Sequence, residues 1–208
     1  MKRLLLLTLL LLGAGRVLAQ GEYYDQRRSL FEVLPIRSSD IVFLGNSITD
    51  GGEWAELFDN RHVRNRGISG DQTGWMLGRL DPILAGHPKR LFLMIGTNDL
   101  AVGISPDEVV ANIARIIERF QTESRWTRLF VQSILPVNGR DFSKFKGHYA
   151  HADAIVETNR LLQALCEEKG VTYIDLWPAL ANADGSTAAI RTTDCIWWAR
   201  GIWCGATP

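Results

Sequence analysis

A chain of 208 residues with 46% hydrophobic and 22% charged residues has the length and composition of one globular domain, which argues against a disordered protein. Basic and acidic residues balance at 23 each, and the basic residues form no stripe along the chain. Nucleic acids and anionic membrane surfaces are therefore not expected partners.

The N-terminal segment has the three parts of a secretory signal peptide. Lys2 and Arg3 are basic, residues 4–12 form an apolar run, and a small-residue pattern ends at Ala19. We expect residues 1–19 to be cleaved after Ala19 and the protein to be secreted or periplasmic. A membrane anchor is the alternative, but the apolar run is too short to cross roughly 30 Å of hydrocarbon. Cleavage would leave 20 basic residues against 23 acidic ones, a net charge of −3.

The remaining chain alternates short apolar runs with segments of helical spacing. Five runs are predicted strands: 40–45, 62–68, 90–96, 128–134 and 171–176. Strands alternating with helices predict a parallel sheet, because each right-handed crossover returns the chain to the same sheet edge. The expected fold class is α/β, a three-layer α/β/α sandwich in which ligands bind beyond the carboxyl ends of the strands.

Two helices have clear sequence signals. Ser105 is placed to cap the first, Pro106 suits its first position, and Glu108 would complete a capping box. Its apolar stripe consists of Val109, Ile113, Ile116, Ile117 and Phe120. The second helix, within 154–170, ends on Gly170, a residue typical of left-handed helix stops.

Three cysteines, at positions 166, 195 and 204, do not make a disulfide framework. Cys166 lies among leucines, and we interpret it as a small buried apolar residue.

The loop after the first predicted strand, "GNSITDGG", offers a nucleophile. Ser47 follows the tight turn at Gly45 and could expose its hydroxyl while its backbone N–H faces a reacting carbonyl. The alternative is that Ser47 only caps a helix. A phosphate-binding loop is excluded, because no Gly-Lys-Ser/Thr follows.

The loop after the second strand, "NRGISGDQTG", offers a backbone donor. Gly67 and Gly70 allow close approach of a ligand to the main chain, although plain turn chemistry would also use glycine. The glycine spacing does not fit a dinucleotide fingerprint.

The loop after the third strand, "MIGTNDL", places Asn98 where its amide could donate to developing negative charge. An Asx-turn is the alternative. Three successive strand ends that supply a hydroxyl, a backbone N–H and an amide together indicate an acyl-transfer site.

These three blocks resemble those of the SGNH (GDSL-type) hydrolases, in the same order over residues 41–99. The resemblance implies Ser47 as nucleophile, with the Gly70 N–H and the Asn98 side chain completing an oxyanion hole. It also implies a five-stranded sheet in flavodoxin-like order, an esterase domain over residues 20–190, and no metal or organic cofactor. Asn46 is a departure, since many members have aspartate there.

The family's last block would supply an aspartate and, three residues later, a histidine that accepts the serine proton. Asp194 stands near the expected place, but the third residue after it is Trp197, which cannot accept a proton. The general base is therefore missing from the sequence, and the final helix is expected to be missing or aberrant.

The tail, residues 191–208, has an unusual composition that suggests a frameshift. It holds three of the seven tryptophans and two of the three cysteines. When the possible codons from Thr192 onward are read from their third bases, they permit "DGLHLVGEGYLVW", which resembles the family's closing block. Its aspartate would come from the codons of Thr192 and Thr193, so Asp194 would be coincidental. We predict that the protein as printed is nearly inactive and that a repaired one is an esterase.

Other histidines could lie near the site. His148 and His151 follow the fourth strand, and we expect them to line the substrate entrance or begin a helix. A replacement base, or a zinc site with Asp153, is less favoured, because further ligands at suitable spacing are lacking. His62 and His87 are interpreted as structural.

The leading functional prediction is a secreted serine esterase that hydrolyses carboxylic esters through an acyl-serine intermediate. The expected substrate is a small ester, either an acetylated carbohydrate or a lipid ester. A carbohydrate-binding pseudoenzyme without catalysis is the alternative, and a flavodoxin-like cofactor binder is a third candidate.

Overall fold

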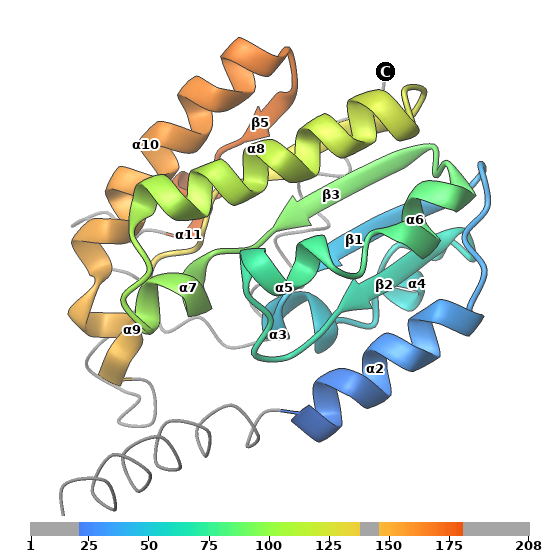
Figure 1. Cartoon of the computed structure of the whole chain (residues 1–208), viewed down its shortest axis with the longest axis horizontal. Coiled ribbons are helices and arrows are strands. Elements are labelled where there is room, and N and C mark those ends of the chain that lie inside the picture. Colours follow the sequence, from blue (N-terminus) through green and yellow to red (C-terminus); the bar gives the residue numbers. More distant parts are fainter. Residues whose placement is uncertain (1–20, 138–145, 181–208) are drawn as a thin grey trace, which may run out of the picture.

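The structure is a computed structural model that describes residues 21–137 and 146–180 (Figure 1). The predicted signal peptide, residues 1–19, and the tail with Asp194 lie outside the described residues.

Five parallel strands form one sheet in the order β2-β1-β3-β4-β5, which is the flavodoxin-like order (Figure 1). The strands are β1 (Ile41–Gly45), β2 (Val63–Gly67), β3 (Arg90–Met94), β4 (Arg128–Gln132) and β5 (Thr172–Ile174). All four pairings are parallel, as predicted from the alternation of strands and helices. In register, Gly45 pairs with both Gly67 and Met94, so the first three strands end at one level.

Ten helices surround the sheet in the described part of the chain. They are α2 (Gly21–Val33), α3 (Ser47–Asp50), α4 (Trp54–Leu57), α5 (Thr73–Leu77), α6 (Asp81–Gly86), α7 (Thr97–Ala101), α8 (Pro106–Glu123), α9 (Lys146–Ala150), α10 (Ala152–Lys169) and α11 (Trp177–Leu180).

The helix α8 forms where the sequence predicts it. The hydroxyl of Ser105 accepts a hydrogen bond from the Glu108 backbone N–H at 3.2 Å, as an N-cap should. All five residues of the predicted stripe are buried against the sheet. At the other predicted helix, α10 ends at Lys169 and Gly170 is left-handed, with φ of 65°.

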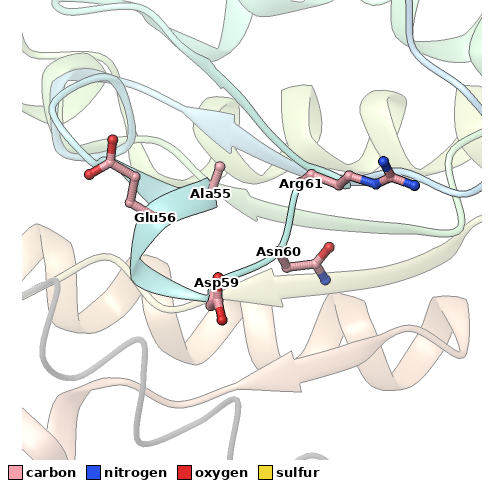
Figure 2. A pocket seen from close by; sticks show the side chains of 5 residues that line it. All are labelled: Ala55, Glu56, Asp59, Asn60 and Arg61. Carbon is pink, nitrogen blue, oxygen red and sulfur yellow. The ribbon is translucent and has the colours of Figure 1, made fainter.

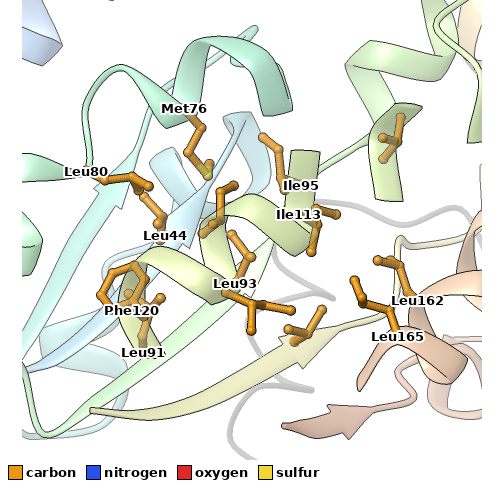
Figure 3. Packing of buried hydrophobic residues seen from close by; sticks show 14 of the residues in the cluster. Leu44, Met76, Leu80, Leu91, Leu93, Ile95, Ile113, Phe120, Leu162 and Leu165 are labelled. Carbon is orange, nitrogen blue, oxygen red and sulfur yellow. The ribbon is translucent and has the colours of Figure 1, made fainter. Parts of the chain in front are cut away.

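The main core lies between the sheet and the face covered by α5, α6, α8 and α10 (Figure 3). Leu44, Leu91 and Leu93 point from the central strands into this face, where Met76, Ile113 and Leu162 meet them (Figure 3). Burial of such side chains contributes about 1.5–3 kcal/mol each before the opposing chain entropy is counted. Cys166 belongs to the same cluster, and burial raises the pKa of its thiol to about 11.

Aromatic side chains cover the opposite face of the sheet. The ring of Phe43 stacks on Trp54 of α4 at 4.6 Å and on Phe92 at 4.9 Å, and Phe92 stacks on Phe130 at 4.6 Å between centroids. Alternate residues of β1 therefore enter two different cores, which makes the three-layer α/β/α arrangement.

The helix α2 was not predicted from the sequence, because its apolar pattern is weak. The helix lies beside the β2 edge of the sheet (Figure 1), where Phe31 is buried beneath the guanidinium groups of Arg27 and Arg66. Among the described residues, no helix combines the length and apolar character needed to cross a membrane.

Candidate active site

Ser47 is the first residue of α3, directly beyond the end of β1, and it is exposed. Asn46 is the N-cap, because its side-chain oxygen accepts from the Ile48 N–H at 3.2 Å. The capping alternative for Ser47 is therefore wrong, and the amide of Asn46 supplies the acceptor that an aspartate could supply. No described side chain hydrogen-bonds to the Ser47 hydroxyl. Its backbone N–H belongs to the first turn of a helix, where N–H groups have no partner within the helix.

The second loop approaches α3 closely. A Cβ atom on Gly67 would lie 2.1 Å from the backbone nitrogen of Asp50, so only glycine fits at this position. Gly70 has a φ of 83°, a left-handed backbone conformation that favours glycine. Its N–H donates to no acceptor among the described residues. That N–H is therefore available to a ligand.

Asn98 is the second residue of α7, beyond the end of β3. Its side-chain Nδ2 donates to the backbone oxygen of Asp71 at 2.9 Å, across to the loop that carries Gly70. The carboxamide does not close an Asx-turn on its own loop, which makes that alternative wrong. The hydrogen bond joins the second and third loops at one edge of the sheet, where the arrowheads of β1, β2 and β3 point (Figure 1).

A buried ion pair connects the end of β1 to the second loop. Arg79 donates to the Asp71 carboxylate at 2.6 and 2.8 Å, to the Arg66 backbone oxygen at 3.0 Å, and to the Gly45 backbone oxygen at 3.2 Å. Burial raises the pKa of Asp71 to about 6, against the opposing effect of Arg79. The carboxylate is thus ionised at neutral pH although its side chain is fully buried.

A second buried carboxylate fixes the start of α5. Asp99 accepts from the Thr73 hydroxyl at 2.6 Å and from the Thr73 N–H at 2.9 Å, and Asn112 of α8 donates to the same hydroxyl at 2.9 Å. Burial raises the pKa of Asp99. These hydrogen bonds connect the third loop, through Asp99, to Thr73 near the end of the second loop.

The carboxylate of Asp50 connects α3 to the residue before Gly70. It accepts from the Ser69 N–H at 3.1 Å, from the Ser69 hydroxyl at 2.7 Å, and from the Tyr23 hydroxyl of α2 at 2.6 Å. Arg27 of α2 forms an ion pair with it at 3.3 Å. The pKa of the Tyr23 hydroxyl is raised, and its hydrogen bond to Asp50 is the largest cause. No sequence pattern indicated this cluster, because α2 itself was not predicted.

We expect Asp50→Ala to lower the free energy of unfolding by roughly 2–3 kcal/mol, because several hydrogen bonds to one charged group are lost together. Tyr23→Phe removes one hydroxyl and should lower it by only about 1 kcal/mol. Chemical denaturation measures both, and amide hydrogen exchange at Ser69 should accelerate in Asp50→Ala alone. If the two variants lose the same free energy of unfolding, Asp50 does not hold this cluster of hydrogen bonds together.

One histidine, His148, contacts a residue of the candidate site. His148 of α9 lies with its Nε2 3.2 Å from the Asn98 Oδ1. His62 lies 3.6 Å from Asp40, and His87 lies 3.2 Å from the Ser124 hydroxyl, at the other end of the strands. The site residue Asp194 falls outside the described residues. Within those residues, no three histidine, cysteine, aspartate or glutamate side chains are grouped as a metal site requires.

A shallow depression lies elsewhere, over α4 and the turn that follows it (Figure 2). It is lined by Ala55, Glu56, Asp59, Asn60 and Arg61. Arg61 lies two residues before Val63, the first residue of β2, so this depression is at the amino end of that strand. It is therefore separate from the loops that carry Ser47, Gly70 and Asn98.

The sequence profile of the GDSL-like lipase/acylhydrolase family matches residues 43–195. Among curated proteins, the chain is similar to the platelet-activating factor acetylhydrolase IB subunit alpha1 of Bos taurus, with 27% identity over 161 residues. That match covers 72% of this chain and 64% of the bovine protein, which is less than two thirds of its length.

Solved structures show the same fold. A Streptococcus pneumonia protein named as a platelet activating factor superposes with a TM-score of 0.78 at 25% identity, covering 96% of this chain and 98% of the other. An acetylxylan esterase from Geobacillus stearothermophilus superposes with a TM-score of 0.60 at 17% identity, covering 81% and 94%.

Proposed function

This chain belongs to the GDSL-like lipase/acylhydrolase family, a family of ester hydrolases, and from that premise we propose that it is an exported serine esterase using Ser47 as its nucleophile. The observation that carries the proposal is the exposed Ser47 hydroxyl beyond the end of β1. The two neighbouring loops offer hydrogen-bond donors, the Gly70 N–H and the second side-chain N–H of Asn98.

In the proposed reaction, the Ser47 oxygen attacks the ester carbonyl carbon and its proton passes to a general base. The carbonyl oxygen becomes an oxyanion that the N–H groups of Ser47 and Gly70 and the side-chain amide of Asn98 stabilise. The alcohol leaves with that proton, and water then hydrolyses the acyl-serine. One Asn98 N–H is engaged by Asp71, so its second N–H is the one left for the oxyanion.

The proposed substrate is a small acetyl ester of a carbohydrate or a lipid. Two proteins that the chain resembles carry names that point to acetyl groups, an acetylhydrolase and an acetylxylan esterase. The N-terminal pattern supports export through a signal peptide cleaved after Ala19.

We further propose that this chain is impaired, because the position of the family histidine holds Trp197. The family match ends at residue 195, just before that position, which supports a change of reading frame nearby. The same substitution favours the second candidate function, a carbohydrate-binding pseudoenzyme that retains the fold without the chemistry.

A fluorophosphonate probe tests the nucleophile directly. We expect the probe to label Ser47 in a chain whose residues 192–204 are replaced by "DGLHLVGEGYLVW", which restores a histidine base, and Ser47→Ala in that chain to abolish labelling, because a serine hydroxyl reacts readily only when a base activates it beside an oxyanion hole. Ser39→Ala, at the opposite end of β1, is the matched control and should label normally. Mass spectrometry of the labelled peptide identifies the site. Binding of acetylated oligosaccharide without labelling would instead support the pseudoenzyme.

A further inference from the structure

Building on the proposed function, we propose that His148 is a positioning residue that holds the Asn98 carboxamide in the orientation needed to donate to an oxyanion. His148 lies 50 residues from Asn98 in the sequence, yet its Nε2 is 3.2 Å from the Asn98 Oδ1.

Close packing of two short helices brings these residues together. The helix α9 lies against α7, which carries Asn98 (Figure 1). Next to His148, a Cβ atom on Gly147 would lie only 3.0 Å from the Ala101 backbone oxygen, so a larger residue would push α9 away. The absence of a side chain at 147 therefore lets the imidazole reach the end of β3.

The contact between Asn98 and Asp71 shows which atom donates in the hydrogen bond between His148 and Asn98. The Asp71 backbone oxygen can only accept, so the Asn98 atom that faces it at 2.9 Å must be the NH₂ group. The Oδ1 atom then faces His148, and since this oxygen can only accept, Nε2 must carry the hydrogen. Both the Nε2–H tautomer of neutral histidine and the imidazolium satisfy this requirement.

The two hydrogen bonds to the Asn98 carboxamide together fix its orientation, which a single hydrogen bond would not do. The terminal torsion of an asparagine is broad and close to two-fold, so a single hydrogen bond leaves the amide free to swing. With Asp71 holding the nitrogen and His148 holding the oxygen, the amide plane is fixed and a flip would break both contacts. A hydrogen bond accepted by the amide oxygen also polarises its N–H groups and makes them better donors.

The test uses the full chain and two substitutions of His148. His148→Phe keeps a ring of similar size without an N–H, and His148→Gln restores a side-chain donor. The first readout is the ¹⁵N–¹H spectrum of the Asn98 side-chain amide, assigned by its loss in Asn98→Asp. We expect the Asn98 amide protons to move upfield in His148→Phe and to return toward their native positions in His148→Gln.

The second readout is the affinity of phenylboronic acid, which needs no general base. The Ser47 oxygen adds to boron, its proton passes to solvent, and the tetrahedral adduct places an oxygen in the proposed oxyanion hole. We expect His148→Phe to weaken this binding by about tenfold and His148→Gln to recover most of the loss. Unchanged Asn98 amide shifts in His148→Phe overturn the proposal for His148, whereas failure of the native chain to bind phenylboronic acid overturns the proposed chemistry of Ser47.

Discussion

Replacing residues 192–204 with "DGLHLVGEGYLVW" should raise the rate of acetyl-ester hydrolysis on the order of a million-fold over the printed chain. The size follows from serine proteases, in which loss of the histidine of a catalytic triad lowers kcat by roughly that factor. The histidine at the fourth position of the new segment would accept the Ser47 proton, and the aspartate at its first position would fix the imidazole tautomer. Hydrolysis of a chromogenic acetyl ester by the two purified proteins measures the effect.

Two controls separate the base from the rest of the segment. The repaired chain with its new histidine changed to alanine should return to the rate of the printed chain, since it keeps any gain in folding but has no base. Ser47→Ala in the repaired chain should be equally inactive, because nucleophile and base act as a unit. A repaired chain no faster than the printed one would refute the frameshift hypothesis, as would a coding sequence with no histidine in the alternative frame.

The fold could be predicted from the sequence because each strand and each long helix has its own local signal. The stripe from Val109 to Phe120 and the stop at Gly170 depend only on neighbouring residues, and both are confirmed. Predicted strands extend past the observed ends by a residue or more, as for 171–176 against Thr172–Ile174. A strand ends where its backbone leaves the neighbouring strand, and the pattern of apolar residues does not show where that happens.

Less of the candidate site could be predicted. The three strand ends show where Ser47, Gly70 and Asn98 should stand, because parallel strands in register end at one edge. The side-chain contacts that connect these loops could not be predicted from the sequence. Asp71 meets Arg79 eight residues away, and His148 meets Asn98 across 50 residues, through contacts that only the packed helices create. Roles assigned through the family resemblance remain predictions for these residues, and Asp194 is outside the described chain.

The largest loss of stability is expected from Arg79→Met, about 3–5 kcal/mol in the free energy of unfolding. The substitution leaves Asp71 as a buried carboxylate without a counterion, and it also removes donors from the Gly45 and Arg66 backbone oxygens. Chemical denaturation at pH 7.5 measures the loss. The exposed ion pair of Arg160 with Glu157 provides the matched control, since Arg160→Met should leave the unfolding midpoint unchanged.

The pH dependence of this loss identifies its cause. The pKa of Asp71 already lies near 6 in the folded protein, above that of an unfolded chain, and it should rise further without Arg79. A carboxyl group with a raised folded pKa contributes stability that is full below its unfolded pKa and is lost as the pH rises through the folded value. The Arg79→Met protein should therefore gain stability relative to the native chain as the pH falls from 7.5 to 5, and adding Asp71→Asn should remove that trend. A deficit that does not change with pH would mean that the lost backbone contacts, and not the uncompensated carboxylate, account for the instability.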